Sequence, residues 1–134
     1  LLKEKIMLRR FFIACTAIFL IACGGGGDDV NVAGNWIGTA KAIVNGVEST
    51  GSGTWSISQS GNKLTGVSKG DNGSASTLEA TIEGNIISGN AYPSNPKNCP
   101  SKYVMTVNGN TMTGTSVTYN CTATVAATLT LTRQ

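Results

Sequence analysis

The chain has 134 residues and a formal net charge of +3, with ten basic residues, seven acidic residues and no histidine. Four of the basic residues and one acidic residue lie before Cys23, so the chain from residue 23 onward carries six of each sign and is neutral. A chain of this length is expected to form one domain. Because the chain is neutral, it is not expected to bind nucleic acid, which requires a basic patch.

The first segment has the pattern of an export signal. Residues 11–22 form an apolar run, FFIACTAIFLIA, that follows Arg9 and Arg10. A membrane-spanning helix needs about 20 apolar residues, whereas the core of a signal peptide needs about 7 to 15 behind a basic flank. We therefore expect a signal peptide over residues 1–22, and Met7 is a candidate start because MLRRFF opens a compact basic region.

The end of this segment, Leu20-Ile21-Ala22-Cys23, resembles the lipobox of bacterial lipoproteins. The resemblance implies that Cys23 is acylated and becomes the mature N-terminus. We then expect a protein of the bacterial cell envelope, anchored to the outer membrane on its periplasmic or surface side. Residues 23–31 contain four consecutive glycines, which favour flexible coil, so they are expected to form a lipidated tether. The alternatives are ordinary signal cleavage and a short uncleaved anchor.

Residues 32–134 have the pattern of an all-β domain. They are rich in Thr, Ser, Val, Ile and Gly, and one motif recurs three times, as GNKLTG at 61–66, GNIISG at 84–89 and GNTMTG at 109–114. Alternate residues before each first glycine face one side of a strand, and eight of these nine can face an apolar interior: Trp55, Ile57 and Gln59; Leu78, Ala80 and Ile82; Tyr103, Met105 and Val107. The period of two predicts half-buried strands.

Further turn signals at 45–46, 71–73, 93–102 and 120–121 give eight antiparallel strands, the first two near 34–44 and 52–59 and the last near 122–132. Hairpin signals favour pairing between sequential strands, and eight strands can close a sheet into a small barrel. We therefore predict an eight-stranded up-and-down barrel over residues 32–134. A β-sandwich is the alternative, in which the first and last strands would not pair.

The start of the first strand carries a second resemblance. Gly34-Asn35-Trp36 is similar to the Gly-x-Trp motif of lipocalins and related avidin-like barrels. In those families the tryptophan closes the barrel floor against an arginine from the last strand, and Arg133 is in phase with Leu129 and Leu131 here. The resemblance implies a lipocalin-like barrel with a cation–π contact between Trp36 and Arg133. The alternative is that Trp36 only fills the core and Arg133 is solvated.

Two cysteines remain after Cys23, namely Cys99 and Cys121. An even pair in an exported chain predicts a disulfide, and the barrel topology places both on neighbouring loops of one end. The alternative is a pair of free buried thiols. A bond between them would close a loop long enough to stabilise the fold by about 3 kcal/mol.

Enzymatic chemistry is not expected. The chain has no histidine, so the usual general base and imidazole-based metal sites are missing, and we expect no catalytic residues, no metal and no cofactor. Glu79 and Glu83 stand four residues apart on a strand, about 13 Å, which is too far for a glycosidase pair. Ser94-Asn95-Pro96-Lys97 matches a Ser-x-x-Lys pattern but lies in a Pro-flanked loop without companion motifs.

The leading functional hypothesis is a non-enzymatic, monomeric lipoprotein whose barrel binds a small hydrophobic ligand at its mouth. We expect Trp55, Tyr103 and Met105 to form the interior wall, and Tyr92 or Tyr119 to lie at the rim. The alternative is that these residues only fill the barrel. Two other functions remain open: an interaction module, for example a hydrolase inhibitor that binds an envelope protein through loop 93–102, and a structural surface lipoprotein.

Overall fold

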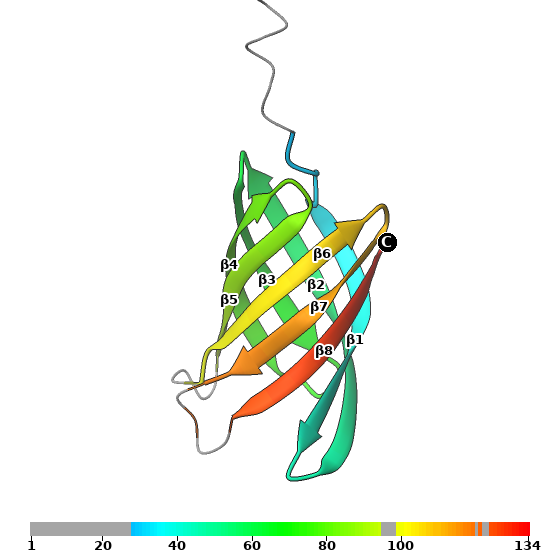
Figure 1. Ribbon diagram of the computed structural model, residues 1–134, viewed down its shortest axis with the longest axis vertical. Helices are drawn as coiled ribbons and strands as arrows, with labels where there is room; N and C mark the ends of the chain where they lie inside the picture. The colour runs from blue at the N-terminus through cyan, green and yellow to red at the C-terminus, as the bar shows by residue number, and fades with distance from the viewer. Residues whose placement is uncertain (1–27, 95–98, 120, 122–123) are drawn as a thin grey trace, which may run out of the picture.

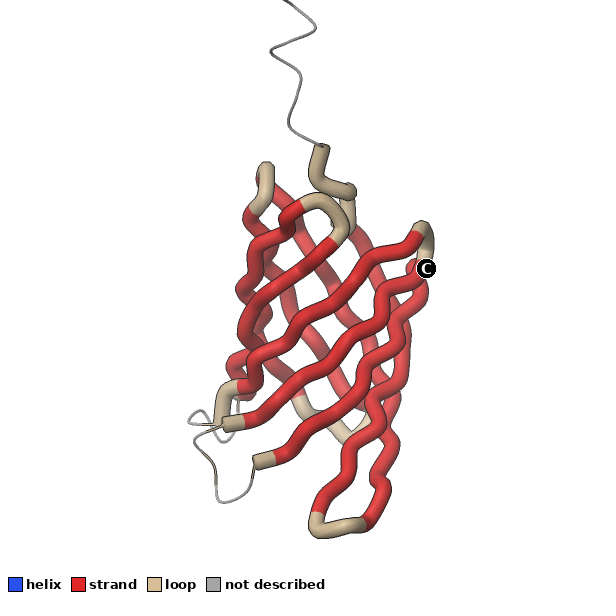
Figure 2. Tube along the Cα trace, viewed as in Figure 1, coloured by secondary structure: helices blue, strands red, loops and turns tan. Residues whose placement is uncertain are grey.

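The computed structural model describes residues 28–94, 99–119, 121 and 124–134. Eight antiparallel strands form a closed barrel in sequence order, and no helix occurs among the described residues (Figures 1 and 2). The strands are β1 (Gly34–Val44), β2 (Val47–Ser60), β3 (Lys63–Gly70), β4 (Ala75–Glu83), β5 (Ile86–Pro93), β6 (Ser101–Asn108), β7 (Thr111–Thr118) and β8 (Val125–Arg133). The predicted up-and-down barrel is confirmed.

The barrel closes through β1 and β8, which pair from Trp36↔Arg133 to Ile43↔Ala126. This pairing excludes the sandwich alternative. It leaves the interior to side chains that alternate along each strand, as the period of two predicted. The buried core holds one to three residues from each strand and one residue that precedes β1; it consists of Val32, Trp36, Ile57, Leu64, Leu78, Ile82, Ile87, Tyr103, Met105, Val107, Met112 and Leu131.

The three Gly-Asn repeats form equivalent turns at one end of the barrel. Gly61, Gly84 and Gly109 each have a φ near +60°, the conformation that the first position of a tight hairpin turn requires and that glycine adopts without strain. In each turn the backbone carbonyl of the asparagine accepts a hydrogen bond from a backbone N–H of the strand that follows the hairpin: Asn62 from Ile82, Asn85 from Val107 and Asn110 from Arg133. Each repeat therefore bonds its hairpin to the strand that follows it.

The β1–β2 hairpin is longer than the sequence predicted and projects beyond the other strands at the opposite end of the barrel (Figure 1). Its β2 begins at Val47 rather than near residue 52, and the tip is a tight turn in which Asn45 and Gly46 both have positive φ. The stretch ESTGSG resembles a loop in composition, but pairing with β1 keeps it extended. An ion pair of 3.3 Å between Lys41 and Glu48 bridges the two strands on their exposed face.

Candidate functional site

One end of the barrel, here called the floor, is closed by Trp36. The ring is fully buried, and its Nε1 donates a 3.0 Å hydrogen bond to the carbonyl of Val32, which is also fully buried. The Arg133 guanidinium lies 4.5 Å from the ring centroid, so the contact expected from the phase of the two residues is present. The same guanidinium donates to the carbonyls of Ala33 and Asn31, at 2.9 and 2.7 Å. Trp36 and Arg133 therefore hold the segment that precedes β1 against the floor.

Residues 28–33, here called the strap, cross this floor before β1 begins. Val30 donates its backbone N–H to Gly84, and Gly84 in turn donates to the Asp29 carboxylate at 2.8 Å. The Gln59 side chain accepts from Val32 at 2.8 Å and donates to the carbonyl of Val30 at 3.2 Å. Residues 29–31, which belong to the segment expected to be a flexible tether, are thus bonded to the barrel. Residues 23–27 of that tether, Cys23 included, and the predicted signal peptide lie outside the described residues.

Buried side chains fill the middle of the barrel. Met105 is fully buried and Tyr103 is 4% exposed. Burial raises the pKa of the Tyr103 hydroxyl above its usual range. Its ring packs edge-on against Trp55, with centroids 5.1 Å apart and an interplanar angle of 71°. Three residues were expected to line the interior wall of a ligand site. Tyr103 and Met105 belong to the packed core, and Trp55 lies nearer the open end of the barrel.

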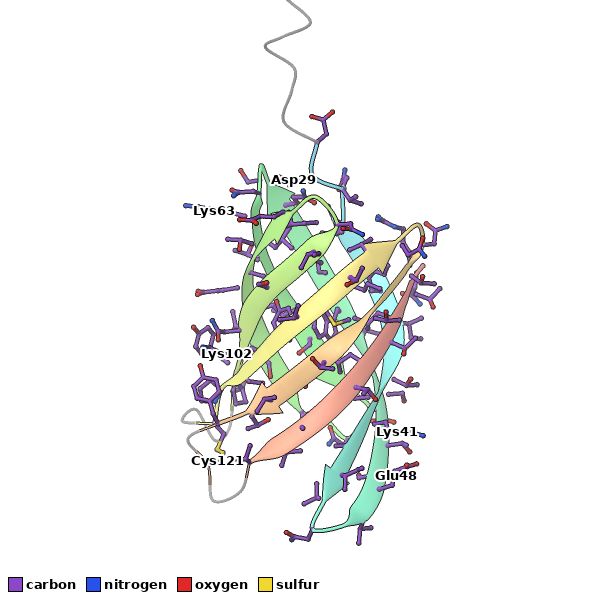
Figure 3. All side chains as sticks on the ribbon, in the orientation of Figure 1. Asp29, Lys41, Glu48, Lys63, Lys102 and Cys121 are labelled. Carbon is purple, nitrogen blue, oxygen red and sulfur yellow. A yellow bond between two sulfur atoms is a disulfide. The ribbon has the colours of Figure 1, made fainter. Side chains whose placement is uncertain are left out.

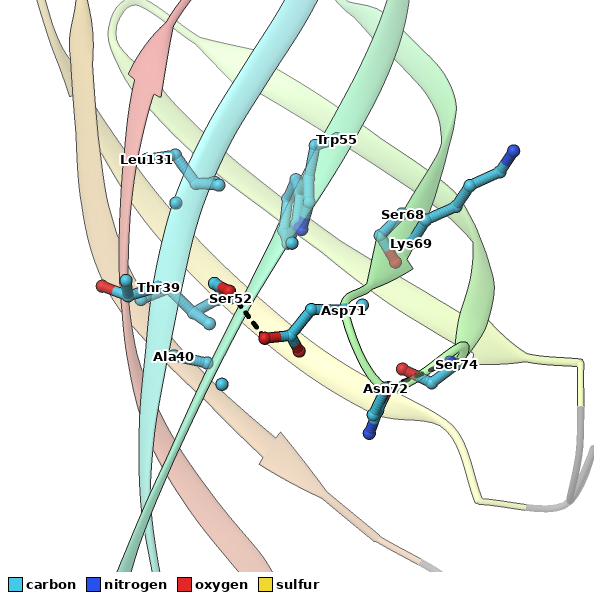
Figure 4. A pocket seen from close by; sticks show the side chains of 15 residues that line it. Thr39, Ala40, Ser52, Trp55, Ser68, Lys69, Asp71, Asn72, Ser74 and Leu131 are labelled. Carbon is cyan, nitrogen blue, oxygen red and sulfur yellow. Dashed lines mark hydrogen bonds between the residues drawn. The ribbon is translucent and has the colours of Figure 1, made fainter.

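A pocket opens at this other end, here called the mouth, between β1, β2, β3 and β8. Its volume is about 280 Å³, and it exists because several inward positions of β1, β2 and β3 are glycine or alanine. Figure 4 shows Trp55 and Ser68 on neighbouring strands, and Asn72 and Ser74 together in the turn that follows β3. The lining consists of Gly38, Thr39, Ala40, Gly51, Ser52, Gly53, Trp55, Ser68, Lys69, Gly70, Asp71, Asn72, Ser74, Leu129 and Leu131. Of the five predicted ligand residues, this lining contains Trp55.

Hydrogen bonds fix the polar side of the mouth. Ser52 Oγ donates to Asp71 Oδ2 at 2.7 Å, and this bond is the main cause that lowers the pKa of the Asp71 carboxyl. Asp71 also donates its backbone N–H to the carbonyl of Ser52, which ties the β3–β4 turn to β2. Within that turn, Asn72 Oδ1 accepts from the backbone N–H of Ser74 at 2.9 Å. The carboxylate is therefore ionised at neutral pH and held at the pocket rim.

Ser68, Asn72 and Ser74 line the pocket although the sequence did not predict them as site residues. Ser68 is in phase with two inward glycines, Gly66 and Gly70, and that phase is a signal that could have found it. Asn72 and Ser74 lie in a turn, where no alternation indicates which way a side chain points. A Cβ placed on Gly70 would lie 2.5 Å from Ser74 Oγ and 2.7 Å from Asn72 Oδ1, so both polar atoms gather over this glycine.

The two tyrosines expected at the rim lie near β5 and β7, outside the lining of this pocket. Tyr92 is 40% exposed. Tyr119 donates its hydroxyl to Asn90 Oδ1 at 3.3 Å, and Lys102 Nζ lies 6.0 Å from its ring centroid. These contacts link the Tyr119 ring to Asn90 of β5 and Lys102 of β6.

Cys99 and Cys121 form a disulfide, with Cα atoms 5.3 Å apart. The bond links the segment before β6 to the segment after β7, at the end of the barrel opposite Asp29 (Figure 3). Residues 95–98 of the loop that was expected to bind a partner protein lie outside the described residues. The disulfide therefore braces the mouth on the side away from the pocket.

Two kinds of feature are missing from the described part of the chain. No group of three or more His, Cys, Asp or Glu residues there could hold a metal ion. No helix among those residues is long and apolar enough to cross a membrane.

No family model and no curated protein matches the chain. Among solved structures, it is similar to a protein of unknown function of the DUF3598 family from Nostoc punctiforme, with a TM-score of 0.48 and 15% sequence identity. The similarity covers 77% of this chain and 48% of that chain, so this chain spans about half the length of the neighbour. Because the function of the neighbour is unknown, the similarity transfers no activity.

Proposed function

We propose that the protein is a non-enzymatic lipoprotein of the bacterial cell envelope, anchored through Cys23 to the outer membrane, that binds a small ligand at the mouth of its barrel. The pocket of about 280 Å³ between β1, β2, β3 and β8 is the observation that carries the proposal. Ligand sites are concave, largely apolar and furnished with a few polar groups, and the mouths of β-barrels are a common place for them. Trp55 and Leu129 supply apolar surface here, and Ser68 supplies a hydroxyl.

The position of the strap supports an arrangement in which the mouth faces away from the membrane. Asp29 lies at the floor, and a lipid on Cys23 would reach the barrel from that side (Figure 3). The closed end would then point toward the bilayer and the pocket toward solution. A ligand could enter without passing the anchor.

Blocking the pocket tests ligand binding. A Cβ on Gly51 would meet no atom within 4 Å, so Gly51→Phe can fill the pocket without displacing the backbone. Ser49→Phe is the matched control, because Ser49 points to the same side of β2 nearer the hairpin tip and is not part of the lining. Native mass spectrometry of the full-length protein, purified in detergent from bacterial membranes, should detect a bound small molecule in the parent and in Ser49→Phe but not in Gly51→Phe.

Retention of the small molecule by Gly51→Phe, or its absence from all three proteins, would contradict ligand binding at the mouth. The anchor is tested separately by growth with a labelled fatty acid. The parent chain should carry the label, and Cys23→Ala should lose both the label and the membrane association. A Cys23→Ala protein that stays labelled and membrane-bound would refute the anchor.

A further inference from the structure

We infer that the mouth pocket binds a neutral sugar ring. This inference rests on the proposed function, because it names the class of ligand for the same site. Four properties of the pocket carry it: its size, its aromatic surface, the hydrogen-bonding groups left without partners, and the distribution of charge.

Size limits the ligand to something small. Drug-sized ligands occupy pockets of about 300 to 1,000 Å³. A volume of about 280 Å³ lies just below that range and suits one six-membered ring with its substituents. A long acyl chain would need the interior of the barrel, which Met105 and its neighbours fill.

The apolar surface is confined to one part of the pocket. Trp55 of β2 provides a rigid ring, because Tyr103 packs against it edge-on with centroids 5.1 Å apart. Leu129 and Leu131 lie on β8, on the other side of β1. An indole presents a flat apolar face and one polar edge, which suits a ligand that is itself apolar on one face and polar at its edges. A sugar ring has this character, since its C–H bonds gather on its faces and its hydroxyls lie around its rim.

The hydrogen-bonding groups of the pocket include both donors and acceptors. Within the described part of the chain, no hydrogen bond occupies Trp55 Nε1, Ser68 Oγ or Ser74 Oγ, which are all able to donate. Asp71 can only accept, because its pKa is lowered and it is ionised at neutral pH. A carboxylate ligand would use only the donors, an ammonium ligand only the acceptors, and a hydrocarbon neither. A hydroxyl can use both.

The charge at the rim disfavours anions. Asp71 is negative, and the Lys69 side chain extends away from the pocket (Figure 4). No other cationic side chain contributes to the lining. An anionic ligand would therefore meet a carboxylate with no compensating cation, which leaves a neutral polyol as the best match.

The test uses the indole N–H signals of the two tryptophans. Trp36 Nε1 is buried and bonded to Val32, whereas Trp55 Nε1 has no partner in the described structure and faces the pocket. The full-length protein is labelled with ¹⁵N-tryptophan and purified in detergent. Its indole N–H signals are then followed by NMR while glucose, galactose or N-acetylglucosamine is added. We expect at least one sugar to shift the Trp55 signal saturably while the Trp36 signal stays fixed and reports an intact fold. Ser68→Ala should weaken the binding of that sugar about tenfold. Ser58→Ala, on the outer face of β2, should leave the affinity unchanged.

A second titration separates failure of this inference from failure of the proposed function. Toluene serves as a small apolar probe of the same pocket. If it shifts the Trp55 signal and no sugar does so, the pocket binds small ligands but the sugar class is wrong. If neither probe shifts that signal, the sugar inference and the ligand-binding function both fail.

Discussion

The floor contact offers a stringent test of what holds the barrel closed. Arg133→Met keeps most of the length and apolar stem of the side chain but removes its charge and its donors. The substitution deletes a part-buried bond to Ala33, a more exposed bond to Asn31 and the cation–π contact with Trp36. From typical values of about 1.5 kcal/mol for a charged, partly buried bond, about 0.5 for an exposed one and about 1 for the cation–π contact, we expect a loss of about 3 kcal/mol.

That loss corresponds to a decrease of roughly 15 °C in Tm for a domain of this size. Thermal unfolding followed by circular dichroism measures it. Lys63→Met is the control, because Lys63 is an exposed lysine at the start of β3 with no ion pair in the described structure. A double-mutant cycle with Trp36→Leu should return a coupling energy of about 1 kcal/mol for the ring and the guanidinium. The reasoning is refuted if Arg133→Met unfolds within a degree or two of Lys63→Met.

Three further predictions concern other parts of the barrel. Gly114→Ala should destabilise by about 1 to 3 kcal/mol, because a Cβ there would overlap a backbone carbonyl of β6, whereas Gly51→Ala meets open space and should be nearly neutral in urea unfolding. Replacing Cys99 and Cys121 by serine should lower the free energy of unfolding by about 3 kcal/mol, and an unchanged urea midpoint would contradict this value. The pKa of the Asp71 carboxyl is lowered in the folded state, so the carboxylate stabilises the fold at pH values above its ordinary pKa of 3.8, and this stabilisation is lost as the pH falls further. Asp71→Asn should therefore have a lower Tm than the parent at pH 6, and the two Tm values should converge near pH 2.

The wall of the barrel could be predicted from the sequence because successive side chains of a strand point alternately into the barrel and out to solvent. Ile57, Leu78 and Val107 were assigned to the interior by their phase alone, and all three are buried. The Gly-Asn turns could also be predicted, because glycine adopts the positive φ that a tight hairpin turn requires. These signals are local, and a closed barrel follows once the strands are counted.

The strap and the pocket could not be predicted in the same way because they depend on contacts between distant parts of the chain. Gln59 was the polar exception among nine inward positions, and the structure gives its reason: it bonds to Val32 and Val30, 27 and 29 residues earlier. Small inward residues such as Gly38 and Ala40 are compatible with either a cavity or a narrow barrel. The side chains of other strands decide between the two, so the outcome differs between the filled middle and the open mouth.

The closure of β1 against β8 places the end of the described chain beside its beginning, since Gln134 donates its backbone N–H to the carbonyl of Asn35 at 3.0 Å. A short linker could join residue 134 to the strap, and the Asn45–Gly46 tip offers an exposed site for new termini. Such a circular permutant would keep every strand pairing. A lipid attached to its new N-terminus would tether the barrel by the mouth, so the direction in which the pocket faces is set by where the chain is cut and can be reversed by design.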